Sequence, residues 1–306
     1  MDEIRTLTAS AHGAGDEQIP VRLPRPVLAL AAVTGVTAGA ASLLGLFGWA
    51  HPVSFTTVRG EVVDLFGDGL YQYDSVFSGA GNRGTDVITL LIALPLLALS
   101  VLGCRRGSLR WQLVVTGALV YFLYVSTSVA VGAAFNPAFL IYVVAFGASL
   151  WGFILSIGSV DRTRLTSVLS ELPRRAPAVL MIVSGVVTAV IWAGPVLVAQ
   201  FAGTAPPRMD GYTTLVTVAI DCAVIAPAAI ASGVLIWRRR SWGYLMAVPL
   251  LILLALMAPL IAAQTVSQLS AGAVLTAGQI VGPVGGFVVL ALAAVVVLWS
   301  LLRRVR

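Results

Sequence analysis

One acidic residue lies inside a long apolar stretch of the chain. Asp221 follows the aromatic residue Tyr212 by nine positions. Aromatic residues mark the membrane boundary and a helix rises 1.5 Å per residue, so the carboxylate would lie roughly 13 Å inside a bilayer. Inserting a carboxylate at the membrane centre costs about 2.5–3.5 kcal/mol, and such residues typically line a cavity or an ion path. We therefore predict that Asp221 binds a small substrate or an ion, or relays protons.

Asp221 also has a structural interpretation. Polar side chains of neighbouring helices can satisfy a buried carboxylate without any ligand. The sequence offers several partners for this role: Tyr121, Tyr124, Gln264, Arg83 and Arg208. The two interpretations differ in whether Asp221 faces a cavity or a solid core.

A second polar group, residues 82–86, precedes the second apolar stretch. Arg83 carries a planar guanidinium that can hold a carboxylate or phosphate group of a substrate, and Asn82 and Asp86 add a donor and an acceptor. The alternative is a helix cap, because Thr85 or Asp86 at a helix N-terminus would accept hydrogen bonds from free backbone N–H groups. Residues 82–86 are the second predicted binding segment.

The last apolar stretch is interrupted in its outer half by Gln279, Pro283 and Gly285. Proline removes a helical hydrogen bond, so this part is predicted to be kinked or unwound beside a cavity. Gln279 is then a further binding candidate. The alternative is close helix packing through the small residues of this stretch.

Metal, cofactor and nucleic-acid chemistry find no support in the sequence. The two histidines, His12 and His51, are isolated, so the chain cannot build a histidine metal site or a catalytic triad. Residues 64–69 resemble the start of a calcium loop, but Phe66 and Ser75 stand where that loop needs ligands. The net charge of +6 comes from small arginine groups between apolar runs rather than from one basic patch. We predict no metal, no cofactor and no nucleic-acid partner.

These residues must be positioned by helices in a lipid bilayer. Of the 306 residues, 58% are hydrophobic and 10% are charged, whereas a soluble domain carries about 25% charged residues. A helix needs about 20 apolar residues to cross the hydrocarbon core. The candidate spans are 27–50, 87–104, 112–134, 138–158, 178–201, 212–237, 244–265 and 277–302. The predicted fold class is an all-α membrane protein with about eight transmembrane helices.

The arginines orient these helices. All 19 basic residues are arginine, and positive side chains are retained on the cytoplasmic side of a membrane. With the N-terminus inside, 16 arginines fall in inner segments and three, Arg59, Arg83 and Arg208, in outer ones. Both termini are therefore predicted to be cytoplasmic. The absence of lysine suggests a GC-rich coding background, and hence a multi-pass protein of the bacterial cytoplasmic (inner) membrane.

Two features recur at matching places in the two halves of the chain. The second and sixth stretches each contain a proline, Pro95 and Pro227, and each ends in a group of arginines. This recurrence favours two parallel four-helix repeats; the alternative is that inner loops of such a composition look alike. The predicted organisation is a disordered cytoplasmic tail (1–26), a first four-helix half (27–158) with a long outer loop (51–86), a cytoplasmic amphipathic linker (159–177) and a second four-helix half (178–306).

The linker carries Leu165, Val168, Leu169 and Leu172 at helical spacing. This spacing predicts a short amphipathic helix that lies on the inner leaflet. The alternative is a helix that docks a partner protein.

Three segments together carry a resemblance to a known group of proteins. They are Asn82 to Pro95 (NRGTDVITLLIALP), Asn136 to Tyr142 (NPAFLIY), and Tyr212 to Tyr244, with Asp221 within it. They resemble a group of uncharacterised bacterial multi-pass membrane proteins, and the similarity runs along most of the membrane region. The resemblance implies architecture and no established activity. It also implies that Asp221 and residues 82–86 are recurring positions of that group.

Three functions fit these observations. A transporter or permease predicts a polar path from Asp221 toward one surface. An intramembrane enzyme with an outward-facing site predicts that Asp221, Asp86 and loop carboxylates converge on one pocket. An accessory or scaffold protein predicts that packing satisfies Asp221 and that no cavity exists. We favour the transporter over the enzyme, because the acidic loop residues lack metal-ligand spacing.

Overall fold

The computed structural model describes residues 23–305 except 168–171, 208 and 276, and leaves the side chains of 277–283 undescribed. Within these residues, eight helices are long and apolar enough to cross a membrane, which confirms the predicted fold class. The first span is α2 (Arg25–Gly45). The second span is a composite of three consecutive helical segments: α3 (Val76–Ile88), the π-helical turn η2 (Thr89–Ala93) and α4 (Leu94–Cys104). The third and fourth spans are α5 (Leu109–Gly132) and α6 (Phe139–Gly158). The fifth span is α8 (Arg175–Ala202). The sixth span is a composite of α9 (Val216–Ile220), the π-helical turn η3 (Asp221–Ile225) and α10 (Ala226–Trp237). The seventh and eighth spans are α11 (Ser241–Ser270) and α12 (Ala277–Leu302).

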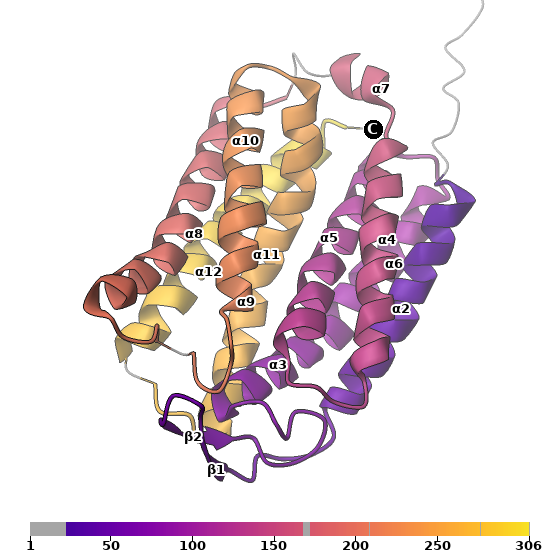
Figure 1. The fold of residues 1–306 in the computed structure, drawn as a ribbon. Coiled ribbons are helices and arrows are strands. Elements are labelled where there is room, and N and C mark those ends of the chain that lie inside the picture. The colour runs from indigo at the N-terminus through magenta and orange to yellow at the C-terminus, as the bar shows by residue number, and fades with distance from the viewer. Residues whose placement is uncertain (1–22, 168–171, 208, 276, 306) are drawn as a thin grey trace, which may run out of the picture.

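The spans form two groups of four that meet where α11 packs against α3 and α5 (Figure 1). Helices α5 and α11 are 56% buried over their most apolar windows, against at most 39% for any other span, so they form the centre of the bundle. Close approach depends on a missing side chain, because a Cβ at Gly117 of α5 would lie 2.3 Å from Ile252 of α11. Small residues at such crossings let membrane helices pack closely.

The second and sixth spans each contain one π-helical turn, η2 and η3. Each lies just before a proline, Pro95 or Pro227. A proline ring clashes with the carbonyl four residues earlier and has no N–H to donate, and a wider turn accommodates both defects. In each case the residue before the proline bonds the carbonyl five residues back, from Leu94 to Thr89 and from Ala226 to Asp221.

The two composite spans agree in register as well as in type. Thr89 and Asp221, the first residues of the two π-turns, are 132 residues apart in the chain. Leu109 and Ser241, the first residues of the next spans α5 and α11, are also 132 residues apart. The second and third spans of the two halves thus show the same order of elements at the same spacing.

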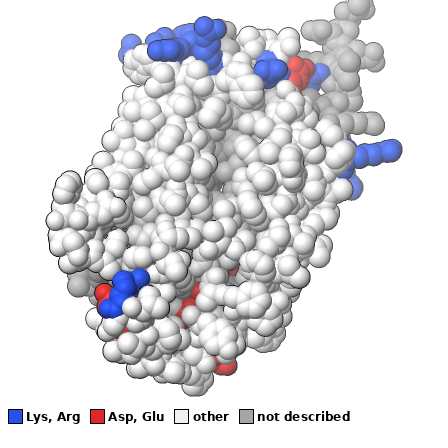
Figure 2. All heavy atoms as spheres, viewed as in Figure 1, with Lys and Arg blue, Asp and Glu red and all other residues white. Residues whose placement is uncertain are grey.

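Charge divides between the two ends of the bundle (Figure 2). One end, called here the arginine-rich end, carries the described arginines of the helix connections at 105–110, 162–175, 238–240 and 303–304. Three of these arginines stack on tryptophans, with Arg162 over Trp242, Arg174 over Trp237 and Arg303 over Trp299. The opposite, acidic end carries Glu61, Asp64, Asp68, Asp74 and Asp210.

The acidic end is covered by a β-hairpin of β1 (Val53–Thr56) and β2 (Val62–Leu65), paired from Val53↔Leu65 to Thr56↔Val62. The loop ends at Ser75, whose hydroxyl caps α3 by accepting from the Ser78 N–H at 3.3 Å. The predicted loop 51–86 was therefore too long, and the predicted cap at Thr85 or Asp86 was wrong.

The cause of this error is the small-residue content of α3. Gly79, Gly81 and Gly84 weaken a sequence-based helix prediction, but here they permit packing. A Cβ at Gly79 would lie 3.0 Å from the Phe66 side chain, and one at Gly84 would lie 2.5 Å from the Gln264 backbone of α11.

The predicted linker contains the short helix α7 (Arg162–Ser167). Leu165 is 1% exposed and belongs to the protein core together with Val160 and Leu172. Its apolar side therefore faces the bundle, not the lipid surface that the spacing had indicated. Val168 and Leu169 lie outside the described residues, as do residues 1–22 of the predicted tail, and α2 already begins at Arg25.

Gly84→Ala should destabilise the protein, because the new methyl group pushes α3 from α11. Overpacking of this kind costs about 1–3 kcal/mol. Gly147→Ala in α6 is the matched control, since nothing lies within 4 Å of its added Cβ, and alanine favours a helix over glycine by about 1 kcal/mol. Thermal unfolding in detergent should show a lower midpoint for Gly84→Ala alone. Equal midpoints would contradict this packing.

Candidate membrane cavity at Asp221

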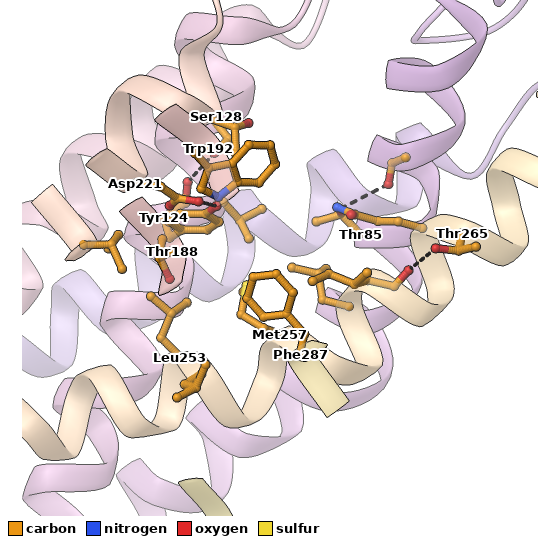
Figure 3. A pocket seen from close by; sticks show the side chains of 18 of the residues that line it. Thr85, Tyr124, Ser128, Thr188, Trp192, Asp221, Leu253, Met257, Thr265 and Phe287 are labelled. Atoms are coloured by element: carbon orange, nitrogen blue, oxygen red, sulfur yellow. Dashed lines mark hydrogen bonds between the residues drawn. The ribbon is translucent and has the colours of Figure 1, made fainter. Parts of the chain in front are cut away.

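A cavity of about 290 Å³ lies between the two halves of the bundle. Its walls come from α3, α5, α8, α11, α12 and the sixth span. Figure 3 shows Asp221, Tyr124 and Trp192 on one side and Thr85 and Thr265 on the other. The sequence prediction that Asp221 faces a cavity, and not only packed side chains, agrees with this geometry.

Asp221 is the first residue of η3 and is 6% exposed. The Tyr124 hydroxyl donates to its Oδ2 at 3.4 Å, a long and weak hydrogen bond. The buried indole N–H of Trp192 lies on the same side of the cavity and has no hydrogen-bond partner of good geometry. An ionised carboxylate can accept about four hydrogen bonds, so these neighbours leave room for a ligand.

A second cavity of about 600 Å³ continues toward the acidic end. The two cavities share seven lining residues, among them Ser78, Asn82, Ser128 and Thr217. These side chains make a polar route from Asp221 outward. Pro206, Pro207, Tyr212 and Thr214 line its outer part.

The opposite side of the inner cavity is apolar. Ala229 of α10 and Leu250, Leu253 and Leu254 of α11 line it toward the arginine-rich end. Asp221 lies five residues inside the helix that begins at Val216, or about 8 Å at the helical rise. It is thus shallower than the 13 Å expected from Tyr212.

Residues 82–86 divide between two environments. Asn82 lines both cavities, and Thr85 lines the inner one, where it accepts a 2.8 Å hydrogen bond from the Gln264 amide of α11. Arg83 instead stacks over Trp49 at 4.2 Å, and neither Arg83 nor Asp86 is among the described residues that line the two cavities.

Asp86 is a buried packing residue of the other face of α3. Its Oδ2 accepts a 2.8 Å hydrogen bond from the Tyr71 hydroxyl of the outer loop. A Cβ at Gly45 of α2 would lie 2.0 Å from the same oxygen, so the carboxylate fills the space that this glycine leaves. The predicted convergence of Asp86 and Asp221 on one pocket is therefore wrong. The side chain of Gln279, the remaining predicted site residue, lies outside the description.

Sequence reasoning missed the contribution of α8. Ser184, Thr188 and Trp192 line the inner cavity at spacings of four residues, which puts them on one helix face. This polar stripe in an otherwise apolar helix was a readable signal. Ser128, four residues after Tyr124 on α5, repeats the same pattern.

Asp74 forms hydrogen bonds with residues of two other helix connections at the acidic end and lies beside the outer cavity. It is 1% exposed, and its Oδ1 accepts from the Tyr212 hydroxyl at 2.6 Å and the Ala134 N–H at 2.8 Å. Its Oδ2 is buried without a hydrogen-bond partner. Burial raises the pKa of Asp74 to about 6, although both hydrogen bonds favour the ionised form. Burial of the Tyr212 hydroxyl and the nearby charge of Asp74 both raise the pKa of Tyr212.

Among the described residues, no group of three or more histidine, cysteine or acidic side chains could hold a metal ion. The chain matches none of the family models, curated proteins or solved structures with which it was compared. The resemblance to uncharacterised bacterial membrane proteins therefore stays a prediction.

Stability should fall as pH rises through about 6, because the folded protein holds a proton on Asp74 that the unfolded chain releases near pH 4. The Tyr212 hydroxyl, which bonds Asp74, stays neutral in this range, because burial and the Asp74 charge raise the pKa of Tyr212. Asp74→Asn removes the titration and keeps an acceptor oxygen. Between pH 5 and 7.5, the thermal midpoint should fall more for the wild type than for Asp74→Asn. Parallel curves would refute the assignment.

Asp86 and Asp221 should respond differently to alanine. Asp86→Ala leaves the buried Tyr71 hydroxyl without its acceptor, at a cost of about 1–3 kcal/mol. Asp221→Ala removes a buried carboxylate that has a long hydrogen bond from Tyr124 and a weak interaction with Trp192, so the thermal midpoint should stay equal or rise. A large loss of stability in Asp221→Ala would identify Asp221 as a structural residue.

Proposed function

We propose that this multi-pass membrane protein is a transporter or permease for a small substrate or ion, with Asp221 as its binding residue. One observation carries the proposal: a carboxylate faces a cavity within the membrane-spanning bundle, and a polar route leads from that cavity to the acidic end. Apolar side chains close the cavity toward the arginine-rich end. This arrangement suits the outward-facing state of an alternating-access cycle.

The enzyme alternative is less well supported. General acid–base chemistry by carboxylates needs a second group near the first. The described lining of the two cavities contains a single carboxylate, Asp221, while Asp74 and Asp86 bond elsewhere. A scaffold without a site leaves the two connected cavities unexplained.

The backbone offers a way for the cavity to change its access. The π-turns at η2 and η3 lack regular helical hydrogen bonds, so the second and sixth spans can bend there at low cost. Matching bends in two parallel repeats would let one half rock against the other along α5 and α11. The predicted bacterial cytoplasmic membrane, with the arginine-rich end inside, sets the direction of this scheme.

Alternating access predicts that single cysteines in the cavity react from both sides. In a Cys104→Ser/Cys222→Ser background, Thr217→Cys should react with a membrane-impermeant thiol reagent from the acidic side. Ala229→Cys, on the apolar side, should react from the arginine-rich side in vesicles of inverted orientation. Gly147→Cys, on a helix face without close neighbours, is the control for reagent leakage. If Ala229→Cys stays unreactive from that side under all conditions, the cavity is one-sided and transport is contradicted.

A further inference from the structure

The inner cavity combines one carboxylate with several aromatic and thioether side chains. Phe77, Tyr124, Trp192 and Phe287 line it, together with Met181 and Met257. No arginine is among the described residues lining either cavity. An ionised Asp221 therefore gives this site a net negative charge, and a cation is the ligand that balances it.

An inorganic metal ion is a poor match for these neighbours. A hard cation needs about six oxygen ligands, and the described residues supply no cluster of acidic or metal-ligating groups. A bare proton, in turn, requires neither a cavity nor an aromatic lining.

The size and lining fit an organic cation. A cavity of about 150 Å³ can hold benzene, so 290 Å³ accommodates one ring together with an ammonium group. Aromatic faces attract ammonium groups, most strongly when water is excluded. Methionine adapts its shape to apolar ligands of different outline.

The acidic end, toward which the outer cavity leads, carries negative charge and therefore attracts cations. Carboxylates at the acidic end raise the local concentration of cations. The arginines described at that end are engaged elsewhere: Arg59 donates to the backbone carbonyls of Asp210 and Tyr212, and Arg83 lies over Trp49. These contacts keep the two described arginines out of the lining of the outer cavity.

We infer that the Asp221 cavity binds a monovalent organic cation with a small apolar body, such as an aromatic or aliphatic amine. The ammonium group lies at Asp221, and the apolar body packs against Trp192, Phe287 and Met257. This assignment deepens the proposed function by naming its substrate class, and it rests on that function only for the passage across the membrane.

Calorimetric titration of the full chain in detergent tests the assignment with defined probes. Benzyltrimethylammonium should bind, tetramethylammonium should bind more weakly because it lacks the ring, and benzenesulfonate should not bind. Asp221→Asn should lose about tenfold or more in affinity, since a charge-assisted contact is removed. Trp192→Leu should lose about fivefold, in line with one cation–π contact. Asp161→Asn, an exposed carboxylate at the arginine-rich end, removes one negative charge far from the cavity entrance and should leave affinity unchanged.

The charge selectivity of the probes does not depend on how well any variant folds. Binding of benzenesulfonate, or unchanged affinity in folded Asp221→Asn, would overturn the assignment. Displacement of benzyltrimethylammonium by sodium but not by potassium at equal ionic strength would overturn it in favour of an inorganic ion. The titration needs no gradient, and the cysteine labelling needs no ligand. A failure of the substrate class is therefore distinguishable from a failure of transport.

Discussion

A proline inside a membrane-spanning helix creates a local problem that lipid cannot solve, because an unpaired backbone group in hydrocarbon costs several kcal/mol. Pro95 and Pro227 present this problem at equivalent points of the second and sixth spans, and both spans respond with one wide turn. The residue that opens each wide turn is polar, Thr89 or Asp221. Tyr121 and Tyr124, three residues apart on α5, bond these two side chains. Pro195, Pro249 and Pro259 lie inside helices that contain no such turn, so the wide turn opened by a polar residue distinguishes the second and sixth spans.

The contrast between the two halves gives the bundle its asymmetry. In the first half, Thr89 and Tyr121 form a 3.1 Å hydrogen bond inside the core. In the second half, the equivalent position carries an aspartate beside a cavity, and α8 adds polar side chains at Ser184 and Thr188. Packed side chains surround the π-turn at Thr89, whereas a cavity lies beside the π-turn at Asp221. The same local backbone arrangement therefore lies in a packed core in one half and beside a cavity in the other.

The sequence predicts the number of spans well, because lipid thickness fixes their length and the arginine groups separate them. It predicts Asp221 as a cavity residue from the cost of burying charge. It fails on Asp86, since two acidic residues near membrane helices look alike until Tyr71 and Gly45 are known to pack against one of them. It also fails on the start of α3, whose glycines are required by tertiary packing rather than by a turn. No local pattern contains either fact.

The hydrogen bonds between distant segments at the acidic end affect the order in which the protein folds during synthesis. Asp74 bonds Tyr212, which lies 138 residues later in the chain, and Arg59 bonds the same connection. At about 5–20 residues per second, a ribosome needs about 7–28 s to reach Tyr212 after Asp74. During that interval the loop can already make its contacts with the first half, from Tyr71 to Asp86 and from the Ala134 N–H to Asp74. Its hydrogen bond to Tyr212 forms only after the fifth span has been synthesised.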